Sequence, residues 1–166
     1  MFLEFSKGDS QMGGNSGPSV MVLETEDDIR TLLTLIFSTN HPDINVEIFS
    51  NEDDLLKRFQ VLCEANEPPK IIITELFING GSNCTFRSGQ QLIKSLYDSH
   101  NQFCSIDSFP FVVFYCSHLP TQFVALLQSL FSQDQYEWVT KPDLDKLFNI
   151  LIDKLQKCFS ADHVFV

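Results

Sequence analysis

The chain has 166 residues, of which 43% are hydrophobic, and it carries a formal charge of −11. This length and composition can bury one sizeable core, so we expect a single globular domain. The 11 Lys and Arg residues are scattered and cannot form the basic stripe that nucleic acid requires. No apolar run approaches the roughly 20 residues that cross a bilayer, and residues 1–6 lack the regions of a signal peptide, so we expect a cytoplasmic protein without a membrane anchor.

The chain begins with a segment unsuited to a packed core. Residues 6–19 are rich in Gly, Ser and Asn, so we predict that residues 1–19 form a flexible arm. The short apolar stretch Met1–Phe5 could add an edge strand or dock elsewhere. The globular domain is predicted to span residues 20–158, and residues 159–166 form a tail without an assigned structure.

The first half of the domain alternates strand and helix signals. Val20–Leu23 predicts a short buried strand, and the capping box Thr25-x-x-Asp28 then begins a helix with apolar residues at helical spacing. Asn45–Ser50 alternates as a second strand. Ser50-x-x-Asp53 is predicted to cap a second helix.

The most informative stretch is the run of three isoleucines at residues 71–73, which follows Pro68-Pro69. It is typical of a central strand buried on both faces. The run delivers Glu75 at its carboxyl end and opens into a Gly- and Asn-rich loop that reaches Arg87. In open parallel sheets, ligands and chemistry collect at this end of a central strand.

The second half repeats the alternation. Ser88-x-x-Gln91 is predicted to open a third helix, and Pro120 to be the first residue of a fourth. Phe109–Tyr115 and Tyr136–Thr140 are predicted strands. The last predicted helix carries an apolar stripe at i, i+3, i+4 and i+7 spacing, made of Leu144, Leu147, Phe148, Leu151 and Leu155.

Five strand–helix units predict right-handed parallel crossovers with helices on both faces of one sheet. The expected fold is therefore an α/β flavodoxin-like (βα)5 doubly wound sheet with strand order 2-1-3-4-5. This order brings several chemically active residues to one edge of the sheet, namely Glu24, Thr25, Glu26, Glu75, Tyr115 and Lys141.

The five cysteines are Cys63, Cys84, Cys104, Cys116 and Cys158. They show no C-x-x-C pair and no zinc spacing, and their odd number does not suit a closed disulfide framework. We interpret them as free thiols of a cytoplasmic protein.

Five segments, in order along the chain, carry a family resemblance: Leu23–Leu33, Pro69–Glu75, Ser88-Gly89, Phe109–Tyr115 and Trp138–Pro142. Together they resemble the response-regulator receiver domain of CheY-like type. They are similar to its acidic strand end, its phosphoacceptor strand, the Asp-Gly that opens its third helix, its fourth strand and its aromatic-x-Thr-Lys-Pro motif.

The departures from this family fall on its chemistry. Glu75 stands where the resemblance places the phosphoacceptor aspartate, and Glu24 and Thr25 stand where it places the paired Mg²⁺-binding aspartates. Tyr115 replaces a Thr or Ser that contacts the phosphoryl group, and only Lys141 is retained. Phosphoryl transfer needs an in-line nucleophile, a divalent cation and a lysine, so we expect little or no phosphotransfer. Weak Mg²⁺ binding by carboxylates remains open at Glu24, Glu26 and Glu75.

Each of these residues also has a purely structural interpretation. The acidic run at residues 24–28 suits a helix N-terminus, where the helix dipole favours negative charge. Glu75 could serve only as the buried ion-pair partner of Lys141, and Tyr115 could simply fill the space left by a missing ligand.

Our preferred hypothesis is a degenerate receiver, or pseudo-receiver, which is not an enzyme, needs no cofactor and signals without phosphorylation. The resemblance implies protein binding through the face built by helix 4, strand 5 and helix 5. No output domain is expected after the last helix, so the partner would be a separate protein or a second copy of the chain. The residues assigned to this face are Phe123, Leu127, Trp138, Asp143 and Lys146.

Two alternatives remain. One is a phosphoaccepting single-domain response regulator that uses Mg²⁺. The other, from a different class, is a flavodoxin-like nucleotide or cofactor binder, although no Gly-rich phosphate loop follows the first strand.

Overall fold

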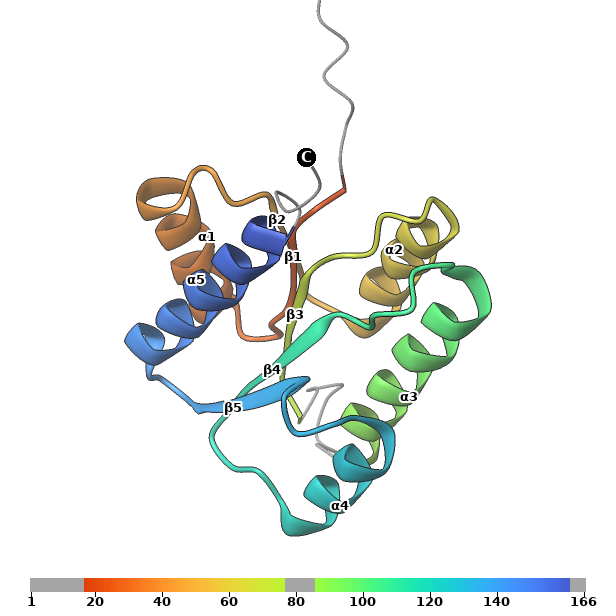
Figure 1. The fold of residues 1–166 in the computed structure, drawn as a ribbon. Coiled ribbons are helices and arrows are strands. Elements are labelled where there is room, and N and C mark those ends of the chain that lie inside the picture. The colour runs from red at the N-terminus through yellow and green to blue at the C-terminus, as the bar shows by residue number, and fades with distance from the viewer. Residues whose placement is uncertain (1–16, 77–85, 162–166) are drawn as a thin grey trace, which may run out of the picture.

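The computed structural model describes residues 17–76 and 86–161. Five parallel strands form one sheet in the order β2-β1-β3-β4-β5, which confirms the predicted fold and strand order (Figure 1). The strands are β1 (Val20–Leu23), β2 (Val46–Phe49), β3 (Ile71–Thr74), β4 (Phe111–Cys116) and β5 (Tyr136–Thr140).

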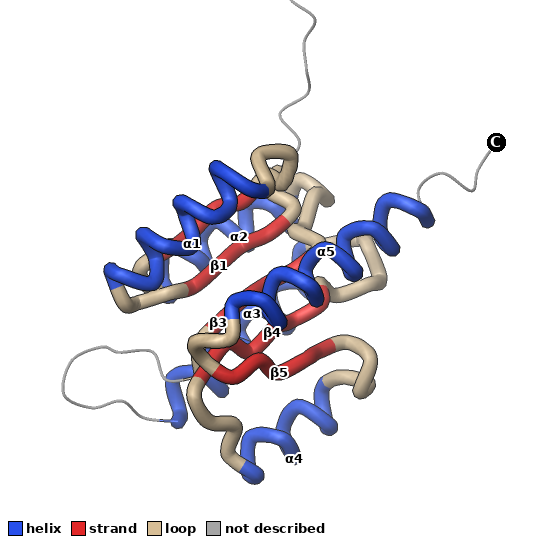
Figure 2. Tube along the Cα trace, turned by 90° about the vertical axis from the view of Figure 1, so that its left-hand side faces the viewer, coloured by secondary structure: helices blue, strands red, loops and turns tan. Residues whose placement is uncertain are grey.

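Helices cover both faces of the sheet. The helices are α1 (Asp27–Asn40), α2 (Glu52–Glu64), α3 (Phe86–Phe103), α4 (Thr121–Leu130) and α5 (Leu144–Ala161). One core cluster joins α1 and α5 to one face, and a second joins α2, α3 and α4 to the other (Figure 1). Figures 1 and 2 both place α4 beside β5 at one edge of the molecule.

The isoleucine run is the central strand that the sequence predicts. Ile71 and Ile73 lie in the cluster with α1 and α5, whereas Ile72 lies in the cluster on the opposite face. All three side chains are buried because successive residues of a strand point to opposite faces and both faces are covered.

Several predicted helix starts are wrong by one or two residues. The expected capping box at Thr25 does not form, since Glu26 is the N-cap of α1 and provides no side-chain cap. In α2 the cap is Asn51 and not Ser50: its side chain accepts a hydrogen bond from the Asp54 N–H. Pro120 is the N-cap of α4 and not its first helical residue. Helix α3 begins two residues before Ser88. These shifts leave the order of the elements unchanged.

Contacts of the described chain extend slightly beyond the predicted boundaries of the domain. The Ser19 N–H donates to the Asn45 carbonyl at 2.8 Å, and the Ser19 carbonyl accepts from the Lys70 N–H at 2.9 Å. Residues 159–161 continue α5. The predictions for residues 1–16, for the loop at 77–85 and for residues 162–166 lie outside the described residues. No helix in the described ranges is long and apolar enough to span a bilayer.

Gly89 fits the first turn of α3 tightly against the end of β3. A Cβ at this position would clash with the Leu76 carbonyl oxygen and lie 3.0 Å from the Leu76 carbonyl carbon. A side chain is therefore excluded by the backbone of a fully buried neighbour. This explains the glycine of the Ser88-Gly89 pair.

We expect Gly89→Ala to destabilise the fold by about 1–3 kcal/mol, because overpacking against backbone forces α3 away from the sheet. Denaturant unfolding measures the change. Gln91→Ala, at an exposed position on the same helix, is the control and should stay within about 0.5 kcal/mol of the parent. Equal stability of the two variants would contradict the tight contact.

Candidate functional site

The residues expected at one edge of the sheet do gather there. Glu24 follows β1, Glu75 follows β3 and Lys141 follows β5, and the carboxyl ends of parallel strands lie at the same edge. Tyr115 comes from the end of β4. Glu24 and Glu75 are buried, with exposed fractions of 1% and 6%.

Lys141 is the centre of this cluster. Its ammonium nitrogen forms an ion pair with Glu75 Oε1 and lies 2.9 Å from Glu24 Oε2 and 3.1 Å from Glu26 Oε1. One cation therefore contacts three carboxylates, of which two are buried. This arrangement holds the pKa of Lys141 above its usual value, although burial by itself opposes the charge.

Both oxygens of Glu75 are engaged. Oε1 pairs with Lys141, while Oε2 accepts hydrogen bonds from the Thr25 hydroxyl at 2.7 Å and from the Thr25 N–H at 3.3 Å. Thr25 is thus a donor to Glu75, and it lies one residue before the N-cap of α1. The sequence analysis assigned Thr25 to a helix cap and to the place of a lost metal ligand, and it missed this role. One signal in the sequence could have indicated it. Thr25 places a hydroxyl where the resemblance expects an aspartate, and the predicted strand order brings this hydroxyl beside Glu75.

Glu24 is held less completely. Its Oε1 accepts from the Glu26 N–H at 2.9 Å, but its buried Oε2 has no hydrogen bond of good geometry despite its proximity to Lys141. Burial raises the pKa of Glu24 to about 7, Lys141 opposes this rise and the charge of Glu75 adds to it. A proton on Glu24 is therefore released only near neutral pH.

Tyr115 forms one wall of the site. It is 2% exposed and packs in the core with α1 and α5, and the Lys141 nitrogen lies 5.4 Å from its ring centroid. Burial raises the pKa of its hydroxyl. The ring offers Lys141 an apolar and weakly attractive surface.

The predicted partner face is only partly at the surface. Asp143 and Lys146 are exposed, and Trp138 is half-buried with its indole N–H donating to the Cys116 carbonyl at 3.1 Å. Phe123 and Leu127, however, are fully buried, so their assignment to this face is wrong. They form the i, i+4 stripe by which α4 packs on the sheet, with the Phe123 ring 5.2 Å from that of Phe114.

The three carboxylates suit Mg²⁺ poorly as they stand. Ligand oxygens of Glu24, Glu26 and Glu75 lie within 4.8 Å of one another, which is compatible with a shared cation. The ammonium of Lys141 already contacts all three of them. Since Mg²⁺ demands close octahedral oxygens, it would have to displace this lysine.

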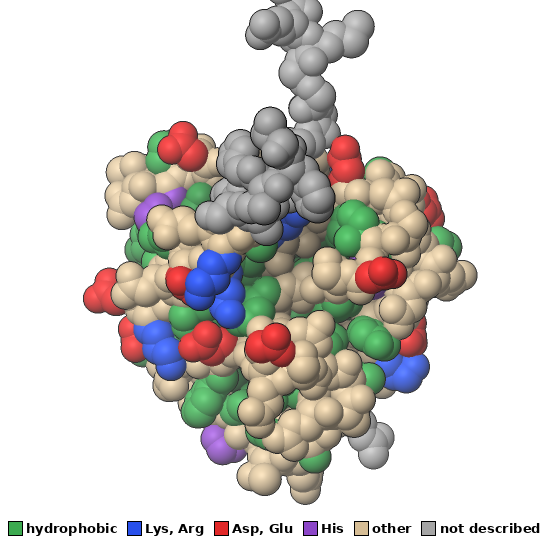
Figure 3. Space-filling model, viewed as in Figure 1, with side chains coloured by type: hydrophobic (Ala, Val, Ile, Leu, Met, Phe, Trp, Pro, Cys, Tyr) green, Lys and Arg blue, Asp and Glu red, His purple; other side chains and the backbone are tan. Residues whose placement is uncertain are grey.

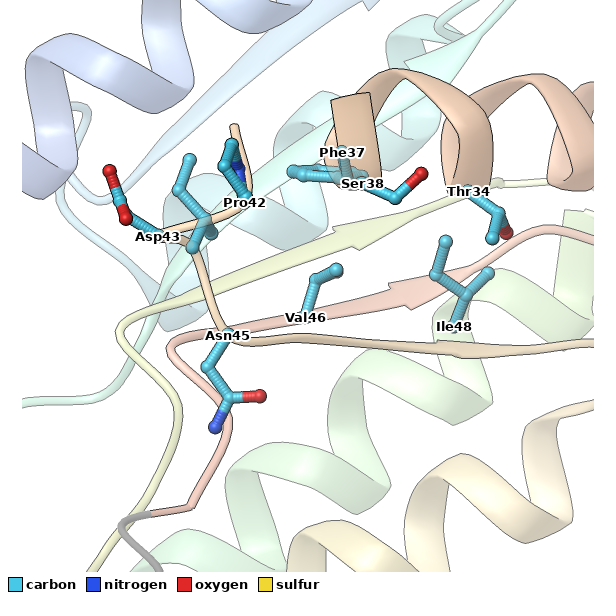
Figure 4. A pocket seen from close by; sticks show the side chains of 9 residues that line it. Thr34, Phe37, Ser38, Pro42, Asp43, Asn45, Val46 and Ile48 are labelled. Atoms are coloured by element: carbon cyan, nitrogen blue, oxygen red, sulfur yellow. The ribbon is translucent and has the colours of Figure 1, made fainter. Parts of the chain in front are cut away.

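A hollow in the described part of the surface lies apart from the acidic cluster. A hollow of about 650 Å³ between α1 and β2 is lined by residues such as Phe37, Ser38 and Val46, and shares none with the acidic cluster (Figure 4). On the face drawn in Figure 3, basic side chains are scattered among acidic and uncharged ones.

No protein-family model and no curated protein matches the chain. Among solved structures, the chemotaxis protein CheY4 of Vibrio cholerae aligns with a TM-score of 0.57 and 13% identity, over 82% of this chain and 98% of that one. The chain therefore shares its α/β flavodoxin-like fold with this chemotaxis protein. A fusion that carries the yeast Spc42 trimeric coiled coil aligns with a TM-score of 0.55 and 14% identity, over 88% of this chain and 80% of that one. Identities this low describe the fold alone, so the chemistry of the site must be inferred from its own residues.

The raised pKa of Glu24 predicts a pH dependence of stability. The folded protein retains a proton that the unfolded chain releases near its ordinary value of 4.5, so this group lowers stability as pH rises from 4.5 to about 7. We expect the free energy of unfolding of Glu24→Gln, relative to that of the parent, to increase as pH rises through this window. The increase between pH 4.5 and pH 8 should be on the order of 1–3 kcal/mol. Lys141 adds no slope here because it stays charged in both states.

Denaturant unfolding at several pH values measures this difference, with the exposed Glu64→Gln as control. A constant difference between Glu24→Gln and the parent from pH 4.5 to 8 would contradict the assignment.

We expect Lys141→Ala to cost roughly 3–5 kcal/mol of stability, because it leaves buried carboxylates without their cation. Lys157→Ala is the matched control: its ion pair with Asp153 joins side chains that are 68% and 55% exposed. Such a pair is worth less than about 1 kcal/mol. Chemical unfolding of the two variants near pH 8 separates the buried cluster from the exposed pair, and similar losses would show that Lys141 is not central.

Proposed function

We propose that this protein is a pseudo-receiver, a signalling or adaptor module that acts by protein–protein interaction without phosphorylation. The observation that carries the proposal is the engagement of both Glu75 oxygens by Lys141 and Thr25. The receiver fold supplies the context, and the resemblance of the sequence supplies the signalling role.

The geometry at Glu75 disfavours phosphotransfer. An attacking carboxylate must present an oxygen in line with the phosphoryl donor while a cation and a lysine absorb the charge. Here Oε1 is ion-paired, Oε2 accepts two hydrogen bonds and the residue is 6% exposed. Attack would require that these contacts break first. The lysine that would otherwise contact a phosphoryl group instead binds the chain's own glutamate.

The same contacts connect the site to the proposed output face. The Cys116 carbonyl accepts from the Lys141 N–H at 3.3 Å and from the indole N–H of Trp138 at 3.1 Å. Lys141 and Trp138 are therefore fixed against one carbonyl at the end of β4. We infer that the pair of Glu75 and Lys141 holds the exposed surface of β5 and α5 in one state. The partner that binds this surface would be another cytoplasmic protein or a second copy of the chain. It would contact Trp138, Asp143 and Lys146.

A phosphoaccepting receiver is the second candidate. The observation in its favour is that three carboxylates present ligand oxygens within 4.8 Å of one another. The position of Lys141 among them weighs against it. The two candidates differ in how strongly the cluster binds Mg²⁺.

We expect the parent protein to bind Mg²⁺ with a dissociation constant of about 1 mM or weaker, because the cation competes with Lys141 for the same oxygens. Lys141→Ala should bind at least about tenfold more tightly, since it removes the competitor and leaves the carboxylates. The fluorescence of Trp138, the only tryptophan, follows the titration, and isothermal calorimetry checks it.

Lys157→Ala is again the control and should match the parent. If Lys141→Ala is too unstable for a titration, the increase of its melting temperature on addition of Mg²⁺ is measured instead. Saturable binding by the parent well below 1 mM, abolished by Glu75→Gln, would favour the phosphoaccepting candidate instead.

A further inference from the structure

Two cysteines lie together at the end of the domain opposite the acidic cluster. Cys63, near the end of α2, is fully buried, and Cys104 follows α3 and packs half-buried against the same core cluster. Burial raises the pKa of the Cys63 thiol, and the neighbouring Cys104 adds to this rise. Figure 1 shows the carboxyl-terminal ends of α2 and α3 side by side.

One residue, Asn66, forms hydrogen bonds to the backbone beside both cysteines. The N–H of Asn66, a residue with φ of 58°, donates to the Cys63 carbonyl at 3.0 Å. Its Oδ1 accepts from the Ser105 N–H at 2.8 Å and from the Ser105 hydroxyl at 2.7 Å. Asn66 therefore ties the chain at Cys63 to the residue directly after Cys104. These hydrogen bonds hold together the two backbone segments that carry the cysteines.

The four described cysteines are free thiols in this structure, and Cys84 lies outside the described residues. We propose that Cys63 and Cys104 form an oxidisable dithiol, which closes to an intramolecular disulfide on reaction with a small disulfide such as oxidised glutathione. This modification site is independent of the acidic cluster and of the proposed signalling function.

The chemistry proceeds by two thiol–disulfide exchanges. The more accessible Cys104 reacts first: its thiolate attacks one sulfur of oxidised glutathione, forms a mixed disulfide and releases one glutathione thiol. Cys63 then loses its proton, attacks the Cys104 sulfur and releases the second glutathione. Overall, two protein thiols are oxidised to one disulfide, and one glutathione disulfide is reduced to two thiols.

Burial sets the order and the speed of these steps. It raises the pKa of the Cys63 thiol to about 12, with Cys104 adding to the rise, so very little Cys63 thiolate exists at neutral pH. Cys63 therefore does not react directly with oxidised glutathione. It reacts only with the Cys104 sulfur of the mixed disulfide, which lies beside it. The closed disulfide would join the end of α2 to the segment before β4 across β3 and α3, and so restrict the unfolded chain.

The test treats the reduced full-length chain with oxidised glutathione and maps all five cysteines by mass spectrometry. We expect the parent to lose two hydrogens, to carry a linked Cys63–Cys104 peptide and to keep no lasting glutathione. Cys63→Ala should trap glutathione on Cys104, because no second thiol displaces it. Cys104→Ser should leave Cys63 unmodified. Cys158→Ser, which removes a half-buried thiol on α5, is the matched control and should behave as the parent.

A stability readout provides a second check that does not depend on any variant. The oxidised parent should unfold at a higher denaturant concentration than the reduced protein, and dithiothreitol should reverse the shift. A lasting glutathione adduct on Cys104 of the folded parent, or a disulfide from either cysteine to Cys84, Cys116 or Cys158, would overturn the proposal.

Discussion

One ammonium group among three carboxylates is the constraint on which the functional edge of this protein depends. Lys141 contacts Glu24, Glu26 and Glu75, and two of these glutamates are buried. A buried carboxylate without a cation is costly, so the three strand ends that supply these residues must remain close together. The fold creates this requirement, because parallel strands deliver their carboxyl ends to one edge of the sheet.

The contacts of the cluster spread into the neighbouring strands. Thr25 fixes the second oxygen of Glu75, and the Cys116 carbonyl holds both the Lys141 N–H and the Trp138 indole. Charge at the site and the position of Trp138 are thus linked through a few hydrogen bonds. In the proposed phosphorylation-independent role, the pairing of Lys141 with the chain's own Glu75 would substitute for an added phosphoryl group.

The fold could be predicted because its signals are local and repeated. Runs such as Ile71–Ile73 and the apolar stripe of α5 specify buried strands and one-sided helices, and alternation of the two implies parallel crossovers. The gathering of Glu24, Glu75 and Lys141 followed from the strand order. The role of Thr25 did not, because a hydroxyl near a helix start suits both a cap and a distant carboxylate. Phe123 and Leu127 were wrongly assigned to the exposed partner face. The resemblance indicates only that α4 contributes to this face, whereas the apolar periodicity of the helix determines which of its side chains are buried.

The central claim is that the pair of Glu75 and Lys141 already occupies the site at which a receiver would be phosphorylated. The most direct measurement adds a small acyl-phosphate donor with Mg²⁺ to the full-length chain and follows the intact mass and the amide NMR spectrum. The account predicts an unchanged mass and unshifted signals for Thr25, Cys116 and Trp138. A stable phosphoryl group on Glu75, with coordinated shifts from Thr25 to Trp138, would contradict it.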